Sequence, residues 1–239
     1  MTRASVFHLP FSRDEGPVLT AFSLVSGDAV STEVVLSIAE KNRYDAFLSP
    51  ARKAGFLNGR VAAKSALSAL VPTALLSEIE IYNGVMDHPL IRESQYHGFQ
   101  VSLSHSGHVA VAVAYPEAHP MGIDIERHRP SGTSVIAGHV TEAERQLVTD
   151  LAHPMGYTML WSARESVSKL LKTGMVANPL FYQVKTIVLL AEGDFELTFT
   201  QLFQYKALCF VTDVFVVSLC FPKKSRCEAW GDLQRVLGV

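Results

Sequence analysis

Two acidic side chains stand one residue apart in the segment GIDIE, at Asp124 and Glu126. In a β-strand alternate side chains share a face, so both carboxylates would project together, roughly 7 Å apart, opposite Ile123 and Ile125. Carboxylates near an apolar core repel each other unless a cation lies between them, and their oxygens suit magnesium or calcium. The segment predicts a divalent-metal site. A half-buried strand with a solvated acidic face is the alternative.

A second candidate set lies in WSARESVSKLLKTG, where Trp161, Glu165 and Lys169 follow one another at four-residue spacing. On a helix these side chains share a face, with Lys172 close by, so an acid and bases form one strip. Glutamate followed by lysine at this spacing is also a common stabilising pair on the solvent side of helices. The strip is therefore either part of a site or a structural ion pair.

Polar side chains also end the strand pattern SLSHSG. Val101 and Leu103 would face one way, Ser102 and Ser104 the other, and His105 lies where the strand gives way to a turn. A histidine and hydroxyls at a strand end can donate hydrogen bonds to a phosphate. The alternative is a histidine with a purely structural role.

Arg60 and Lys64 repeat a positive charge at four-residue spacing. On a helix this arrangement costs stability unless an anion lies between the two side chains. A polyanionic ligand would explain the pair, and a solvated basic face would explain it as well.

The helices that would position these groups can be read from apolar spacing and end signals. Apolar side chains at three- and four-residue spacing predict an amphipathic helix from Arg52 to Leu70, ended by Pro72. Thr141 and Glu144 fit a capping box, which predicts a helix that begins near Glu142. A further helix should run over residues 158–172, with Gly174 as its stop.

The strands follow from alternation and turn residues. Residues 99–126 read as three strands joined by short turns, which favours an antiparallel meander. Two hairpins are predicted later, TIVLL with FELTFT around the turn AEGD, and YKALCFV with VFVVSLCF around Thr212 and Asp213. Helices and strands occur without regular βαβ alternation, so the predicted class is α+β.

Composition excludes several classes of protein. The 239 residues are 48% hydrophobic and 18% charged, as in a compact globular chain, and the formal charge of −2 lacks the basic excess of a nucleic-acid binder. No apolar run is long enough to cross a bilayer, and no secretory signal begins the sequence, so we expect a cytoplasmic protein. Three cysteines without metal-ligand spacing predict reduced, buried or idle thiols: Cys209, Cys220 and Cys227.

Taken in order, LNGRVAAKSAL, SLSHSG, GIDIE and WSARESVSKL resemble the surfactin-type 4′-phosphopantetheinyl transferases, from about residue 50 to residue 175. GIDIE followed some 35 residues later by W-S-x-[KR]-E-S-x-x-K is specific as a pair. The resemblance implies two pseudo-symmetric α+β halves, with the active site in the cleft between them. We place the halves at residues 1–117 and 118–239, and expect a monomer because one chain supplies both.

The resemblance also implies the site. Magnesium would be held by Asp124, Glu126 and Glu165, with Asp124, Glu165 and Lys169 as the catalytic groups. Coenzyme A would be bound by basic and polar side chains, with His105 at the diphosphate, Lys169 at the phosphate near the metal and Lys64 at the 3′-phosphate. The full set of expected coenzyme contacts is Arg60, Lys64, His88, Ser104, His105 and Lys169.

The implied reaction transfers 4′-phosphopantetheine from coenzyme A to a serine hydroxyl of an acyl or peptidyl carrier protein and releases adenosine 3′,5′-bisphosphate. Glu165 would serve as a metal ligand or as the base for the serine proton. A magnesium-dependent phosphohydrolase and a non-catalytic binding module are the alternatives. Damage at Asp124, Glu165 or Lys169 would mark the second, and all three residues are present.

The sequence departs from the family pattern at one coenzyme contact. The family has a Gly-Lys-Pro stretch ahead of the SHS motif, where this chain has Asp87, His88 and Pro89. Histidine is mostly neutral at pH 7, whereas lysine is charged, so this contact would be weaker. Arg164 stands where many relatives have lysine, which is a milder change.

Overall fold

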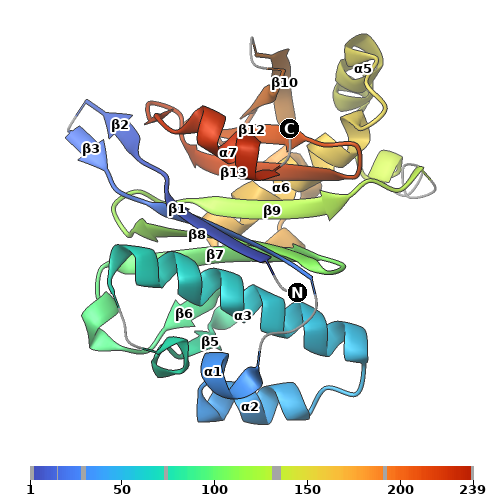
Figure 1. Ribbon diagram of the computed structural model, residues 1–239. Helices are drawn as coiled ribbons and strands as arrows, with labels where there is room; N and C mark the ends of the chain where they lie inside the picture. The colour runs from blue at the N-terminus through green and yellow to red at the C-terminus, as the bar shows by residue number, and fades with distance from the viewer. Residues whose placement is uncertain are drawn as a thin grey trace.

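The computed structural model describes residues 3–14, 16–27, 31–72, 75–130, 136–190 and 193–237. Within them, two larger antiparallel sheets pack against each other, with strand orders β1-β4-β8-β7 and β10-β11-β12-β13-β9 (Figure 1). The strands of the first are β1 (Arg3–His8), β4 (Ala21–Ser26), β7 (Phe99–Ser106) and β8 (Val109–Pro116). Those of the second are β9 (Gly122–Arg127), β10 (Val184–Leu189), β11 (Phe195–Phe199), β12 (Tyr205–Val211) and β13 (Phe215–Pro222).

Two smaller sheets and a set of helices complete the described fold. The smaller sheets contain β2 (Phe11–Arg13), β3 (Gly16–Val18) and β14 (Arg226–Cys227), and β5 (Ile81–Asn83) with β6 (Pro89–Ile91). The α-helices are α1 (Thr32–Val35), α2 (Ile38–Asp45), α3 (Pro50–Leu70), α5 (Glu142–Leu151), α6 (Gly156–Leu171) and α7 (Trp230–Leu237). Short 3-10 turns are η1 (Leu76–Glu78), η2 (Val85–Asp87), η3 (Ser94–Tyr96), η5 (Gly174–Val176) and η6 (Pro179–Tyr182). The predicted α+β class is confirmed.

The predicted helices are present, and their ends follow from local chemistry. Helix α3 begins at Pro50, two residues before the predicted start, because Ser49 caps it and proline suits the first helical position. The predicted capping box of α5 is formed by Thr141 and Glu144. Helix α6 ends at Leu171, where Lys172 adopts the left-handed conformation, and Gly174, the expected stop, has a positive φ as well.

The predicted meander is wrong at its third strand. Strands β7 and β8 pair as expected, but β9 pairs with β13 in the other sheet. The face of β9 that bears Ile123 and Ile125 packs into the apolar core between the sheets, and its other face packs on α6. Both hairpins, β10–β11 and β12–β13, are confirmed, although part of the AEGD turn lies outside the described residues.

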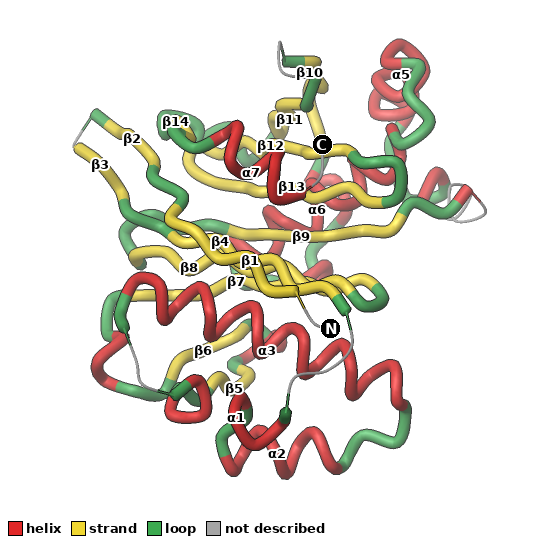
Figure 2. The backbone as a smooth tube through the Cα atoms, viewed as in Figure 1, coloured by secondary structure: helices red, strands yellow, loops and turns green. Residues whose placement is uncertain are grey.

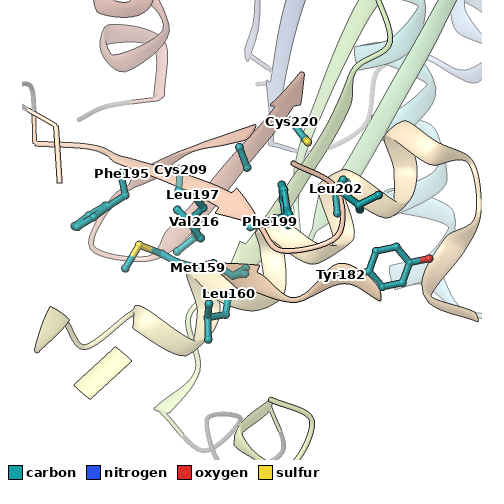
Figure 3. Packing of buried hydrophobic residues seen from close by; sticks show 14 of the residues in the cluster. Met159, Leu160, Tyr182, Phe195, Leu197, Phe199, Leu202, Cys209, Val216 and Cys220 are labelled. Atoms are coloured by element: carbon teal, nitrogen blue, oxygen red, sulfur yellow. The ribbon is translucent and has the colours of Figure 1, made fainter. Parts of the chain in front are cut away.

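Three apolar clusters hold the described layers together. Helix α3 packs on one face of the first sheet and α6 on one face of the second (Figure 2). Figure 3 shows the cluster beside α6, where Met159 lies toward Val216 and Leu197 of the sheet. The third cluster fills the space between the sheets. Strand alternation sends one set of side chains to each cluster.

The elements around the two larger sheets follow one another in the same order. The series β4, α2, α3, β5–β6, β7 and β8 is matched by β9, α5, α6, β10–β11, β12 and β13. The first strand of each series pairs with the last, β4 with β8 and β9 with β13. The predicted boundary at residues 117 and 118 falls between the series, but β14 pairs with β2 across it. The division into 1–117 and 118–239 therefore stays a prediction.

A buried glutamate ties each series together in the same way. Glu40 on α2 accepts hydrogen bonds from the backbone N–H groups of Ser37 and Ile81. Glu144 on α5 accepts equivalent bonds from the N–H groups of Thr141 and Val184. Each glutamate also pairs with an arginine of the following helix, so a buried charge is neutralised in both places.

The thiols agree with the prediction from the sequence. Cys209 and Cys220 are buried, Cys227 is half-buried, and all three are free. Burial raises the pKa of Cys227 to about 11, so its thiol stays protonated at neutral pH. Among the residues described, no helix is both long and apolar enough to span a membrane.

Candidate active site

A pocket of about 390 Å³ lies where the two series of elements meet. Its walls come from α2, α3 and the β5–β6 hairpin on one side, from β7 in the middle, and from the C-terminal part of α6 on the other. The predicted site residues Arg60, His88, His105, Glu165 and Lys169 line it. The tertiary structure thus brings together groups that are up to about a hundred positions apart in the sequence.

Asp124 is only 2% exposed and does not itself line the pocket, but it bonds to Lys169, which does. Its Oδ1 accepts hydrogen bonds from Ser104 Oγ at 2.9 Å and from Lys169 Nζ at 2.7 Å. Lys169 Nζ also donates to Ser104 Oγ at 2.8 Å. The second oxygen, Oδ2, is buried and has no hydrogen-bond partner among the residues that the structure describes. A buried carboxylate oxygen without a partner is costly and needs an explanation.

The two glutamates near Asp124 have raised pKa values. Burial, then the neighbouring Asp124 charge, raises the pKa of Glu126 to about 7. Burial also raises the pKa of Glu165, against the opposing effect of Lys169. Carboxyl groups that disfavour each other's ionisation are the arrangement that a bound cation relieves.

Within the described ranges, no group of three or more His, Cys, Asp or Glu side chains lies close enough together to hold a metal ion as it stands. The residues nevertheless fit one. Asp124 has an unsatisfied buried oxygen, and Glu126 and Glu165 add the hard oxygen ligands that magnesium prefers. Because Lys169 already occupies Oδ1, the free Oδ2 is the Asp124 atom available to a cation.

We expect Glu126→Gln to raise the melting temperature near pH 8 in the presence of a chelator. The folded-state pKa of about 7 exceeds the ordinary 4.5, so the folded chain binds this proton more tightly than the unfolded chain. Stability therefore falls as the pH rises from about 4.5 to 7. Glutamine removes the ionisation, and each kcal/mol regained adds roughly 2–4 °C.

Calorimetry of the wild type and Glu126→Gln near pH 5 and pH 8 measures this effect. The gain should be largest near pH 8 and much smaller near pH 5, where the folded carboxyl is protonated and only the unfolded chain has begun to ionise. A gain of equal size at both pH values would assign it to packing and contradict the electrostatic explanation.

His105 lies at the pocket wall against α3. A Cβ placed on Gly55 would come within 2.7 Å of the His105 ring, so the absence of a side chain at that helix position lets the imidazole pack there. Partial burial, and then the nearby Lys169 ammonium, lowers the pKa of His105. The imidazole is therefore neutral at pH 7 and offers one N–H donor.

Lys64, an expected coenzyme contact, does not line the pocket. Lys64 is completely buried and pairs with Glu40, and its Nζ donates to Val35 O at 2.6 Å. Arg60 pairs with the same glutamate at 2.9 Å but keeps one edge on the pocket. The anion that lies between the like charges of Arg60 and Lys64 is thus the Glu40 carboxylate. The sequence could not indicate it, because Glu40 lies on another helix.

A group of basic and aromatic side chains on this wall was not among the predicted site residues. Arg43 and Arg52 line the pocket together with Phe47 and Phe56. The Arg52 guanidinium lies 4.7 Å from the Phe47 ring centre, and that of Arg60 lies 4.5 Å from the Phe56 ring centre. Such cation–π contacts hold the guanidinium planes in place. The only signal in the sequence is the alternation of arginine and phenylalanine over residues 43–60.

The substituted position His88 also faces the pocket. Its Nδ1 donates a hydrogen bond to the backbone carbonyl of Val85, so in the neutral imidazole this nitrogen carries the proton and Nε2 carries the lone pair. The Asp87 carboxylate accepts a hydrogen bond from Asn83 Nδ2 at 2.9 Å. Arg164 is buried, pairs with Glu144 and donates to His139 O, so it has a structural role.

A family model described as the 4′-phosphopantetheinyl transferase superfamily matches residues 120–220. The holo-[acyl-carrier-protein] synthase of Lactococcus lactis subsp. lactis (strain IL1403) is 37% identical over 86 residues, which are 34% of this chain and 72% of that protein. The chain belongs to the 4′-phosphopantetheinyl transferase superfamily.

Similar relatives come from staphylococci. The holo-[acyl-carrier-protein] synthase of Staphylococcus haemolyticus (strain JCSC1435) is 34% identical over 85 residues, 33% of this chain and 69% of that protein. That of Staphylococcus aureus (strain Newman) is 33% identical over 97 residues, 38% of this chain and 79% of that protein. The superfamily match includes Asp124, Glu126, Glu165 and Lys169, whereas the α3 wall of the pocket lies outside it.

Proposed function

We propose that this 4′-phosphopantetheinyl transferase transfers the 4′-phosphopantetheine group of coenzyme A to a serine hydroxyl of an acyl or peptidyl carrier protein, with magnesium, and releases adenosine 3′,5′-bisphosphate. The observation that supports this most is the Asp124 carboxylate, bonded to Lys169 and with one oxygen unpartnered, beside a basic pocket. The relatives, by name, act on acyl carrier protein.

The proposal includes membership of the surfactin-type branch. In support of it, the matched regions of the relatives cover 72% of their own length but 34% of this chain, which is therefore about twice as long. The additional length contains a second series of the same elements, and the pocket is lined from both series. A single chain would then supply both sides of the site, which supports a monomer.

Asp124, Glu126 and Glu165 would hold the magnesium ion. When bound, the ion would neutralise negative charge on the diphosphate of coenzyme A. Because a bound cation would also lower the pKa values of the carboxylates that hold it, Glu126 would stay ionised at neutral pH. The chain's own groups perform the other tasks.

Lys169 would bind the phosphate that is attacked, since its ammonium lies on the pocket and needs little movement from Asp124. His105 would donate its N–H to the diphosphate as a neutral imidazole. Glu165 would accept the proton of the carrier serine, because a raised pKa makes a carboxylate a stronger base. As Glu165 is also the third ligand, the two roles would require different oxygens of its carboxylate.

The 3′-phosphate contact assigned to Lys64 moves, in this proposal, to Arg43 and Arg52. Both guanidinium groups line the pocket beside Phe47 and Phe56, whose rings could lie against a purine. We expect Arg43→Gln to raise the KM for coenzyme A about tenfold, as loss of one charge-assisted hydrogen bond would. The KM for 3′-dephospho-coenzyme A should change less than about twofold.

Steady-state kinetics with both substrates measures this difference. Arg235→Gln is the control, because Arg235 is an exposed arginine on α7 that pairs only locally with Asp232. Equal effects of Arg43→Gln on both coenzymes would contradict a 3′-phosphate contact.

The proposed function is tested by incubating the protein with coenzyme A, magnesium and a panel of apo-carrier proteins, followed by intact mass measurement. The carrier should gain one phosphopantetheine group, and adenosine 3′,5′-bisphosphate should appear in equal amount. Cleavage of coenzyme A without modification of any carrier would favour a phosphohydrolase. Tight binding of coenzyme A without either product would favour a non-catalytic module.

A further inference from the structure

The bonding of Ser104 differs from what its place in the SHS motif suggests. Its Oγ donates to Asp124 Oδ1 and accepts from Lys169 Nζ, and the residue is only 8% exposed. A serine hydroxyl has a single O–H, so this donor is already used. Phosphate oxygens need donors, and in this arrangement Ser104 has none to offer. The neighbouring His105 lies on the pocket wall, but Ser104 does not.

The serines on either side bind the same strand through its backbone. Ser102 Oγ accepts from Ile123 N at 3.1 Å, and Ser106 Oγ accepts from Arg127 N at 3.2 Å. These bonds fill the edge of β9 that β13 leaves open, so they join the two larger sheets. Ser104 lies between them on the same face of β7 but contacts a side chain. Of the three, it alone acts on the carboxylate.

The bonds to Oδ1 also determine what the other Asp124 oxygen can do. With Ser104 and Lys169 both directed at Oδ1, rotation of the carboxylate is restricted and Oδ2 stays without a protein partner. Residues that bond to a ligating carboxylate in this way orient it, and their loss typically weakens metal affinity by about 10–100-fold.

We propose that Ser104 is a positioning residue, which holds the Asp124 carboxylate with Oδ2 free for a divalent cation, and is not a contact to the coenzyme. This inference rests on the proposed function, because it takes the cation to be one that coenzyme A and the protein share. The first serine of the SHS motif would then orient the carboxylate that binds the metal, and His105 would be the residue of the motif that contacts phosphate.

Calorimetric titration of the full-length protein with coenzyme A tests the proposal, in magnesium and, separately, in excess chelator. The wild type should bind more tightly with magnesium. Ser104→Ala should weaken the Kd in magnesium at least about tenfold and leave the Kd in chelator within about twofold. Ser106→Ala is the control, since it removes a hydroxyl from the same face of β7 that bonds to backbone and, unlike Ser102, does not line the pocket. It should preserve the gain from magnesium.

A direct readout is Mn²⁺ bound in the presence of coenzyme A, measured by electron paramagnetic resonance. Ser104→Ala should lose Mn²⁺ affinity, and Ser104→Thr, which retains the hydroxyl, should restore it. If the alanine variant fails to fold, Ser104→Cys, a weaker donor of similar size, replaces it.

A loss of affinity by Ser104→Ala that is equal in magnesium and chelator would identify a direct coenzyme contact and overturn the proposal. A wild type without any gain from magnesium would also overturn it, as would unchanged affinities in Ser104→Ala or an equal loss in Ser106→Ala. A wild type that binds coenzyme A with magnesium but modifies no carrier would instead refute the proposed function while leaving the role of Ser104 supported.

Discussion

Asp124→Asn is expected to lower kcat/KM for carrier modification about 100-fold or more, equivalent to about 2.7 kcal/mol of transition-state stabilisation. Asparagine has nearly the same volume, and its carbonyl oxygen can still accept the bonds that Ser104 and Lys169 donate. The variant loses the negative charge and the unpartnered oxygen that support metal binding. The effect should therefore fall on activity and magnesium dependence more than on folding.

The rate is measured with coenzyme A and a carrier protein over a range of magnesium concentrations, alongside the melting temperature. Asp194→Asn is a suitable control, because Asp194 is also fully buried but lies at the β10–β11 turn, where Gln234 donates to it. A rate for Asp124→Asn within about threefold of the wild type, insensitive to chelator, would contradict the proposed metal site.

The second large effect is expected for Gly122→Ala. A Cβ at this position would come 2.0 Å from Ser166 O and 2.6 Å from Leu170 N, both of which are backbone atoms of α6. Backbone cannot rotate away as a flexible side chain can, so α6 must move from β9. We expect a loss of about 3 kcal/mol, or roughly 6–12 °C in melting temperature.

Activity should fall as well, because α6 bears Glu165 and Lys169 while β9 bears Asp124. Calorimetry and the carrier assay measure the two losses. Gly231→Ala provides the matched control, since a Cβ on this α7 glycine would meet nothing within 4 Å. In the control the melting temperature should stay the same or rise slightly. An unchanged melting temperature in Gly122→Ala would show that β9 and α6 separate without cost.

The sequence by itself determined the features that depend on near neighbours along the chain. The Thr141–Glu144 capping box, the four-residue spacing of Glu165 and Lys169, and the shared face of Asp124 and Glu126 follow from helix and strand periodicity. The motif order indicated the superfamily, which the comparisons confirmed. The pocket groups drawn from α6 and β7 were predicted for the same reason, because each motif lies within one element.

Only the tertiary structure decided which partners those groups have. Buried donors, acceptors and charges need partners, and these come from any residue that lies nearby in space. The spacing of residues along the chain does not show which residues those are. Lys64 therefore pairs with Glu40 on α2 and does not line the pocket. Likewise, β9 pairs with β13 and not with β8. For the same reason Ser104 donates to the Asp124 carboxylate, a contact that exists only because the edges of the two larger sheets meet there.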